Sequence, residues 1–258
     1  MAKVTILGSA DAFHSCGRRH SAYLLEDGGF TVAVDFGPTA LLSLRLLQFD
    51  PARLDAICIT HLHGDHMGGL PFVVIDGMYY SPRAKTLQIA GPVKMKERFD
   101  LCMRASYEDI LQVQRGFDIN ITELPPGASH SIGPFQLQTF AADHMDAPHS
   151  PLMFRFLLPS GKVISFSGDT RFTNNLMNCA DGADLLVAEC TGLAPPMGRH
   201  STWTDWKANV HEVRAKKIVL SHLGAPVRER GAELLRELLE STGERRVSFA
   251  EDGETFTI

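Results

Sequence analysis

The histidine-rich segment that follows one short apolar run limits the fold of this chain more than any other feature. Residues 56–60 form a compact apolar run, as expected of a buried strand, which leads directly into His61, His63, Asp65 and His66. Imidazole and carboxylate groups together suit Zn²⁺, Mn²⁺ or Fe, and four such groups within six residues can serve two adjacent ions. Nearby glycines permit the sharp backbone path that this requires. The segment therefore predicts a metal-binding turn at the end of a buried strand.

Strand-like runs alternate with helical stretches along the whole chain, which indicates an α/β fold. An Asp-Gly-Gly turn at residues 27–29 predicts a hairpin between strands at residues 21–25 and 31–35, and a closing hairpin is expected over residues 247–258. Many strands without a linker or repeat predict one domain, residues 1–258, whose strands form more than one sheet. A doubly wound sheet or a barrel are the alternatives, and a dinucleotide site is disfavoured because no Gly-x-Gly-x-x-Gly follows the first strand. Further strands are expected at residues 4–7, 119–124, 135–141, 152–158, 163–167, 185–188 and 218–220, and helices at residues 39–49, 99–116 and 233–240.

The composition excludes several classes of protein. A hydrophobic fraction of 44% argues against a disordered or collagen-like chain. No apolar run is long enough to cross a membrane, and the N-terminal segment lacks the apolar block of a signal peptide. The five cysteines are isolated, which fits a reducing cytoplasm. The net charge of −5 argues against a surface that grips nucleic acid broadly.

The segment Thr-His-Leu-His-Gly-Asp-His-Met-Gly-Gly-Leu-Pro at residues 60–71 resembles the signature of the metallo-β-lactamase fold superfamily, and most closely its tRNase Z-like phosphodiesterase branch. Candidates for the later motifs follow in order: Ala-Ala-Asp-His at 141–144, Ser-Gly-Asp-Thr at 167–170 and Leu-Ser-His-Leu at 220–223. An early Asp-Phe-Gly at 35–37 matches the place where the family uses an aspartate to brace the histidine-rich loop. The resemblance implies a four-layer αββα sandwich with mixed sheets.

The resemblance also implies a centre of two divalent metal ions, with Zn²⁺ preferred and Mn²⁺ or Fe as alternatives. A hydroxide between the two metals would act as the nucleophile, and both metals would stabilise the anionic transition state. Asp65 would be a catalytic residue as well as a ligand. By this resemblance one metal is held by His61, His63 and His144, the other by Asp65, His66 and His222, and Asp169 bridges the two.

Three further segments favour a phosphodiester substrate. Arg18 and Arg19 fall where the tRNase Z-like branch has a basic loop, and guanidinium groups orient phosphates well. The segment Ala-Glu-Cys-Thr around Glu189 resembles the His-Glu-Ala-Thr of that branch, and His-Ser-Thr at 200–202 is similar to its later His-Ser-Thr. The resemblance implies that His200, oriented by Glu189, protonates the leaving oxygen.

Other activities stay open at this point. The same dimetal site would serve a carboxylic ester, thioester or lactone hydrolase. A glyoxalase II type is disfavoured because its third histidine sits in Thr-Pro-Gly-His-Thr, whereas this chain has Ala-Asp-His-Met-Asp at 142–146. An iron redox protein or a metal-keeping binding protein is a further class, although nothing in the chain supplies a flavin domain.

The expected substrate is a small molecule. The span between residues 92 and 144 leaves no room for the long Gly/Pro-rich arm with which tRNase Z holds tRNA. Together with the acidic net charge, this disfavours RNA and favours a cyclic or dinucleotide-like phosphodiester. The sequence predicts no membrane partner and leaves a homodimer open.

Overall fold

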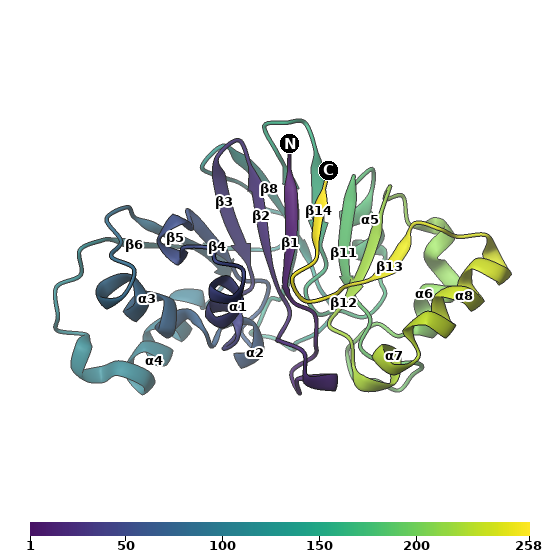
Figure 1. The fold of residues 1–258 in the computed structure, drawn as a ribbon, viewed down its shortest axis with the longest axis horizontal. Coiled ribbons are helices and arrows are strands. Elements are labelled where there is room, and N and C mark those ends of the chain that lie inside the picture. Colours follow the sequence, from purple (N-terminus) through teal and green to yellow (C-terminus); the bar gives the residue numbers. More distant parts are fainter.

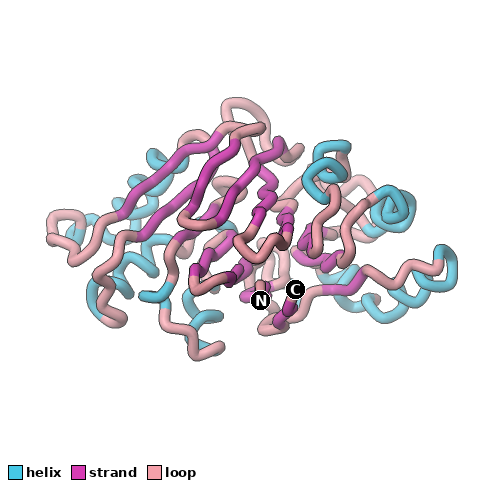
Figure 2. The backbone as a smooth tube through the Cα atoms, turned by 90° about the horizontal axis from the view of Figure 1, so that it is seen from above, coloured by secondary structure: helices cyan, strands magenta, loops and turns pink.

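Two seven-stranded mixed sheets pack face to face in the computed structural model, which describes residues 1–258 (Figures 1 and 2). Helices α1 to α4 flank the first sheet and α5 to α8 flank the second. In sheet order, the strands of the first sheet are β14 (Thr255–Thr257), β1 (Lys3–Gly8), β2 (Ala22–Asp27), β3 (Phe30–Val34), β4 (Ala56–Cys58), β5 (Leu87–Pro92) and β6 (Ile119–Leu124). Those of the second are β13 (Val247–Phe249), β12 (Ile218–Ser221), β11 (Leu185–Glu189), β10 (Val163–Phe166), β9 (Leu152–Leu157), β8 (Phe135–Ala141) and β7 (Ser129–Ile132). The helices are α1 (Ala40–Leu46), α2 (Gly64–Met67), α3 (Leu70–Tyr79), α4 (Met95–Tyr107), α5 (Asn174–Ala180), α6 (Trp203–Asn209), α7 (Ala225–Glu229) and α8 (Gly231–Thr242).

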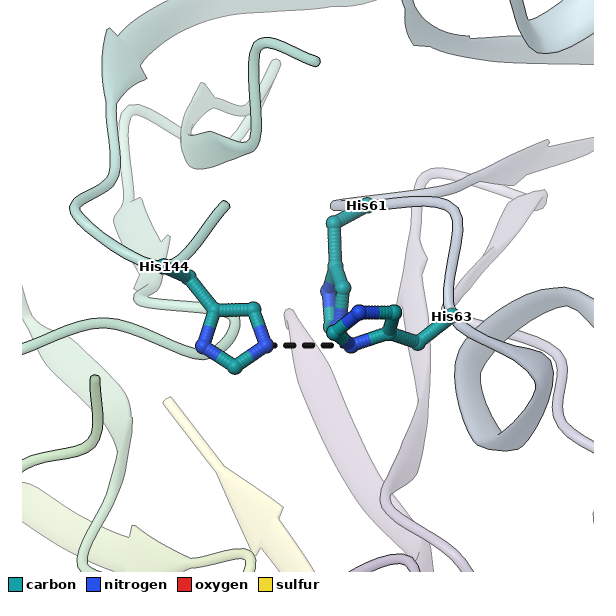
Figure 3. Close-up of side chains that lie close together, drawn as sticks. All are labelled: His61, His63 and His144. Atoms are coloured by element: carbon teal, nitrogen blue, oxygen red, sulfur yellow. Dashed lines mark hydrogen bonds between the residues drawn. The ribbon is translucent and has the colours of Figure 1, made fainter. Parts of the chain in front are cut away.

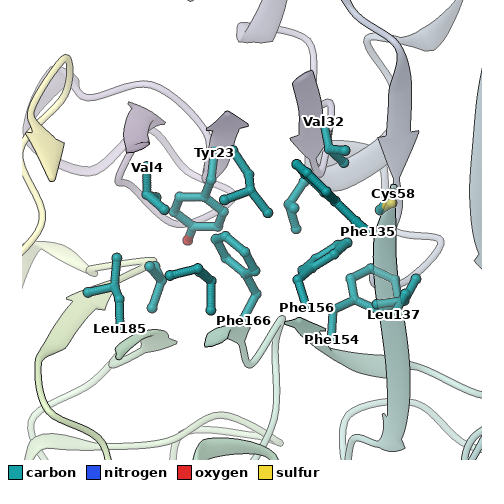
Figure 4. Close-up of a cluster of buried hydrophobic side chains, with 14 of the residues drawn as sticks. Val4, Tyr23, Val32, Cys58, Phe135, Leu137, Phe154, Phe156, Phe166 and Leu185 are labelled. Atoms are coloured by element: carbon teal, nitrogen blue, oxygen red, sulfur yellow. The ribbon is translucent and has the colours of Figure 1, made fainter. Parts of the chain in front are cut away.

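Three hydrophobic cores separate the four layers. The central core lies between the sheets, and its phenylalanines come mostly from the second sheet (Figure 4). Alternation along each strand divides the side chains: Val32 and Val34 of β3 enter the central core, whereas Ala33 packs against the outer helices. The central strands β3, β4, β11 and β12 are covered on both faces and are therefore mostly apolar, whereas β7 and β8 near one edge of the second sheet alternate buried and exposed residues. The expected αββα sandwich is confirmed, and the doubly wound and barrel alternatives are wrong.

The predicted hairpin at residues 27–29 is confirmed, but the closing hairpin is wrong. β13 pairs with β12 in the second sheet, whereas β14 pairs with β1 in the first. The connection crosses between the sheets, where the amide of Ala250 donates to Leu220 O and that of Gly253 to Ile6 O. The two segments therefore pair with the open edge strands of different sheets, although the sequence between them favours a tight turn.

The helix expected at residues 99–116 is displaced. It runs from Met95 to Tyr107 and ends in a 3₁₀ turn, Glu108–Ile110, because the chain must then turn back to bury Phe117 against Gly77 of α3. Between β5 and β8 the chain forms only α4, this turn, β6 and β7, so a long arm is absent as predicted. None of the helices has the length and apolar character needed to cross a bilayer.

Candidate metal centre

The predicted metal ligands follow the carboxyl ends of four strands. β4 leads to His61, His63 and α2, β8 leads to His144, β10 to Asp169 and β12 to His222. Because β3–β4 and β10–β12 are parallel sets, their carboxyl ends lie at one edge of the sandwich, where loops from both sheets meet. Gly168 is required on this path, since its φ is +54° and a Cβ there would lie 2.8 Å from Thr60 Cβ. The fold thus brings all seven predicted ligands together.

Three imidazoles form the first cluster. His63 Nδ1 lies 3.1 Å from His61 Nε2 and 3.1 Å from His144 Nε2, so three ring nitrogens from two separate loops point toward one another (Figure 3). Burial lowers the pKa of His61 well below its ordinary value and lowers that of His144 to about 4. These rings are therefore neutral near pH 7, which is the form of imidazole that binds a metal.

Asp169 lies between this cluster and a second one. Its Oδ2 is 3.3 Å from His222 Nε2 and 3.4 Å from His66 Nε2, and it is 3.7 Å from Nε2 of His61 and of His144. Asp65 completes the second cluster, with Oδ2 3.1 Å from His66 Nε2. One buried carboxylate oxygen thus faces four imidazole nitrogens, as a ligand shared by two metals would.

The donor atoms of the second cluster fit a bound cation. His66 Nε2 and His222 Nε2 are both buried and make no hydrogen bond of normal geometry, although carboxylate oxygens lie 3.1 Å and 3.3 Å away. Leaving a buried polar group unpaired costs about 1–3 kcal/mol, so two such atoms facing carboxylates need an explanation. Burial opposes a charge on His66, but Asp169 and Asp35 outweigh it and raise its pKa well above the ordinary value. The cluster is therefore a site of strong attraction for positive charge.

In His61, His66 and His144, the second ring nitrogen, which faces away from the clusters, also has a partner. Asp35, as the resemblance implies, braces the histidine-rich loop: its Oδ2 lies 2.8 Å from His66 Nδ1, and its Oδ1 accepts the amide of Thr60 at 2.7 Å. Thr60 Oγ1 lies 3.1 Å from His61 Nδ1, and His144 Nδ1 lies 3.0 Å from the carbonyl oxygen of Arg199. Such partners fix the ring orientation and leave the inward nitrogen free for a metal.

Thr191 performs the same task for His222 and connects it to the predicted proton donor. Its Oγ1 lies 2.8 Å from His222 Nδ1 and donates to Glu189 Oε2 at 2.7 Å, while Glu189 Oε1 lies 3.0 Å from His200 Nδ1. Burial opposes a charge on His200, but Glu189 outweighs it and raises the pKa of His200 to about 9. A protonated His200 therefore stands beside the clusters at neutral pH. Thr60 and Thr191 were missed in the sequence; the one available signal is their position next to a ligand or to Glu189.

Arg18 and Arg19 are not brought to the clusters. Arg18 Nη2 forms an ion pair with Glu251 Oε2 at 2.5 Å. Arg19 donates from Nε to Leu7 O at 2.8 Å, and its backbone amide donates to Asp252 Oδ2 at 3.0 Å. Their role as phosphate-positioning residues stays a prediction.

A cavity of about 200 Å³ opens onto the clusters. Its lining includes ligands of both clusters together with His200, and its rim is built from residues that the sequence did not single out, among them Phe13 and Met197. No lysine or arginine lines it. The lining residues are Asp11, Ala12, Phe13, His63, Asp65, His144, Asp169, Thr191, Met197, His200 and His222.

Comparisons with known proteins agree with this centre. The family described as Anti-Pycsar protein Apyc1 matches residues 2–241. A ribonuclease Z from Methanothermobacter thermautotrophicus is 27% identical, over 86% of this chain and 87% of that protein. The crystal structure of human tRNase Z, short form, has a TM-score of 0.78 at 25% identity and covers 99% of both chains. That of the metallo-β-lactamase fold protein YhfI from Bacillus subtilis has a TM-score of 0.76 at 21% identity and covers 100% of both. The chain is therefore a metal-dependent hydrolase with the metallo-β-lactamase fold, and it belongs to the Anti-Pycsar protein Apyc1 family.

Proposed function

We propose that this protein hydrolyses small phosphodiesters with two divalent metal ions, Zn²⁺ in preference to Mn²⁺ or Fe. The observation that carries the proposal is the position of Asp169, whose Oδ2 lies within 3.7 Å of Nε2 of four histidines. A single carboxylate oxygen so placed suits a ligand shared by two ions. One ion would be held by His61, His63 and His144, and the other by Asp65, His66 and His222, with Asp169 between them.

The residues around the metals would handle the proton and the leaving group. A bound pair of divalent ions would supply a nucleophile by lowering the pKa of a water, and would offset the charge that develops on the phosphate. Glu189 engages Nδ1 of His200, so Nε2 is the nitrogen that is left to donate a proton to the leaving oxygen. Because an alkoxide leaves poorly near neutral pH, this proton transfer accelerates cleavage. Glu189 acts as a positioning residue that keeps His200 charged.

The size and charge of the site favour a small substrate over RNA. The cavity has a volume of about 200 Å³, which suits a small phosphodiester better than an RNA strand. The chain lacks an arm between β5 and β8 and carries a net charge of −5. Cyclic or dinucleotide-like phosphodiesters are therefore the preferred substrates, in agreement with the sequence-based expectation.

A second candidate function rests on the absence of a basic residue from the cavity lining. Carboxylic esters, thioesters and lactones develop less negative charge than phosphodiesters and need no cationic side chain to orient them. Hydrolysis of such an ester would use the same metals and the same proton donor, His200. Arg18 and Arg19 would then have no part in binding.

Turnover of two chromogenic substrates separates these functions. Zn²⁺- and Mn²⁺-reconstituted protein is assayed with bis(p-nitrophenyl) phosphate and, at equal concentration, with p-nitrophenyl acetate. Asp169→Ala tests whether the activity belongs to this site, and Asp118→Ala, which removes an exposed carboxylate outside the cavity, is the matched control. Phosphodiester turnover that disappears only in Asp169→Ala is the expected result. Metal-dependent turnover of the acetate alone would contradict the phosphodiesterase proposal and support the ester hydrolase.

A further inference from the structure

We infer that Phe13 binds the part of the substrate remote from the phosphate, by stacking its ring on a nucleobase attached to the ester. Met197, the other large apolar side chain of the cavity, would contact the same group. The inference rests on the proposed phosphodiester hydrolysis and adds a binding role for a residue that lies outside the metal centre. Phe13 and Met197 line the same cavity as His63, Asp169 and His200, so a group attached to a phosphate at the metals would reach them.

The exposure of Phe13 shows that it does not serve the packing of the fold. Its side chain is 84% exposed, whereas Phe72 is the only other exposed phenylalanine of the chain, at 41%. A phenyl ring left in water forgoes the stabilisation that burial would give. An exposed ring at the rim of a cavity is therefore best explained by a partner that covers it when bound.

The turn that carries Phe13 is held firmly. Asp11 is buried, and its Oδ1 accepts the backbone amides of Phe13 and Ser15, both at 3.1 Å, while its Oδ2 accepts the Ser15 hydroxyl at 2.8 Å. The amide of Ala10 donates to Arg19 O at 2.9 Å, which closes the base of the loop. This loop is the dark purple segment that runs between α2 and α7 at the lower edge of Figure 1. Because the ring is presented by a preorganised loop, little ordering is needed when a ligand binds.

The chemistry of the remaining lining favours contact with the face of a base. Apart from Ala12, Phe13 and Met197, the lining consists of Asp11, which holds the turn, and of the ligands and proton-donor network already described. No side chain is left to read the edge of a base by hydrogen bonds. An aromatic ring can stack on a base, and a thioether makes favourable contacts with aromatic rings. The arrangement therefore suits a flat aromatic group bound through its faces.

Kinetics with a substrate pair that differs only in the base test this role. Zn²⁺-loaded protein is assayed with adenosine 3′,5′-cyclic phosphate and with the analogue that carries hydrogen in place of adenine. We expect Phe13→Ala to raise KM for the nucleotide by about tenfold, as for the loss of one base–aromatic stack, and to leave the kinetics of the analogue unchanged. Phe13→Trp should keep a KM within about twofold of the wild type, since it can stack equally well. Tyr79→Ala, which removes a 59% exposed ring of α3 outside the cavity, is the matched control and should change neither substrate.

Several results would overturn the inference. Equal losses on both substrates in Phe13→Ala would assign Phe13 to the structure of the loop. An unchanged KM for the nucleotide would refute stacking, and an unchanged KM with a lower mass by light scattering would assign Phe13 to a contact between two copies of the chain. Wild-type protein that cleaves bis(p-nitrophenyl) phosphate but not the nucleotide would refute the stacking role alone. Wild-type protein that cleaves no phosphodiester would refute the proposed function itself.

Discussion

Replacing Thr191 with valine removes one hydroxyl that controls two functional side chains. The hydroxyl has a single proton, which it donates to Glu189 Oε2 at 2.7 Å, so toward His222 Nδ1, 2.8 Å away, its oxygen must act as an acceptor. This places the proton of a neutral His222 on Nδ1 and leaves the Nε2 lone pair for a metal. Valine keeps the shape of threonine but none of the hydrogen bonds of the hydroxyl, which also lies 3.1 Å from His222 O and 3.3 Å from His200 Nδ1, so we expect Thr191→Val to weaken the site that contains His222.

The contacts set the size of the effect. Loss of an outer partner of a metal-bound histidine lowers metal affinity about 10–100-fold, which corresponds to about 1.4–2.7 kcal/mol. In the variant, Glu189 still accepts the amide of Thr170 at 2.6 Å and still contacts His200 Nδ1 at 3.0 Å. We therefore expect the free energy of unfolding to fall by about 1–2 kcal/mol, which is in the lower part of the range for a buried group that loses its partner. In a chain of this length the melting temperature would fall by about 2–4 °C for each kcal/mol.

Titration of the metal-free protein with Zn²⁺ against a chromophoric chelator measures both affinities. We expect one site of wild-type affinity and one weakened site in Thr191→Val, whereas Thr204→Val, which loses an exposed hydroxyl bonded to Leu193 O, should keep both. Two wild-type affinities in a folded Thr191→Val protein would refute the argument. Equal weakening of both sites would also contradict it, because Thr191 contacts no residue of the first cluster.

The remaining predictions concern the shared carboxylate, the proton donor and the basic loop. Asp169→Ala should lower the bound metal from two ions to one or none per chain, measured by elemental analysis, with a native circular dichroism spectrum; two retained ions would refute the shared ligand. Glu189 raises the pKa of His200, whose acid form is lost as the pH rises, so Glu189→Gln should shift the alkaline limb of kcat to lower pH, and an unmoved limb would exclude His200 as the acid. If Arg18 leaves Glu251 to hold a phosphate, Arg18→Ala should raise KM about tenfold and Glu251→Gln should lower it. Unchanged KM values in both variants would show that Arg18 binds no substrate.

The sequence contains the proposed ligands in recognisable form because most of them follow a strand. His61, Asp169 and His222 come just after apolar runs and His144 after an alternating one, and strands that end at one edge of a sandwich bring such residues together. The role of Thr191 could not be found in this way. It depends on the pairing of Glu189 with Ser221 between β11 and β12, which sets Thr191 beside His222 although the sequence separates them widely.

Contacts between residues far apart in the sequence also explain why the prediction of the closing hairpin was wrong. The turn signal near residue 252 is genuine, but it turns the chain from one sheet into the other because both sheets offer an open edge. Arg18 lies in a loop whose composition suits a phosphate, yet its charge is taken up by Glu251, a residue from the far end of the chain. The exposure of Phe13 likewise depends on the conformation of its loop, which could not be predicted from the local sequence.

The division of the ligands between the two sheets has a consequence for biosynthesis. Ribosomes add about 5–20 residues per second, so roughly 150 residues between His66 and His222 correspond to about 8–30 s of translation. The nascent chain would complete the first cluster once His144 has emerged, but the second only when His222 has, after β12 is made. During that interval Asp65 and His66 would be exposed without their later partner. If the two proposed ions bind as their ligands are made, the first cluster would thus be able to hold an ion before the second.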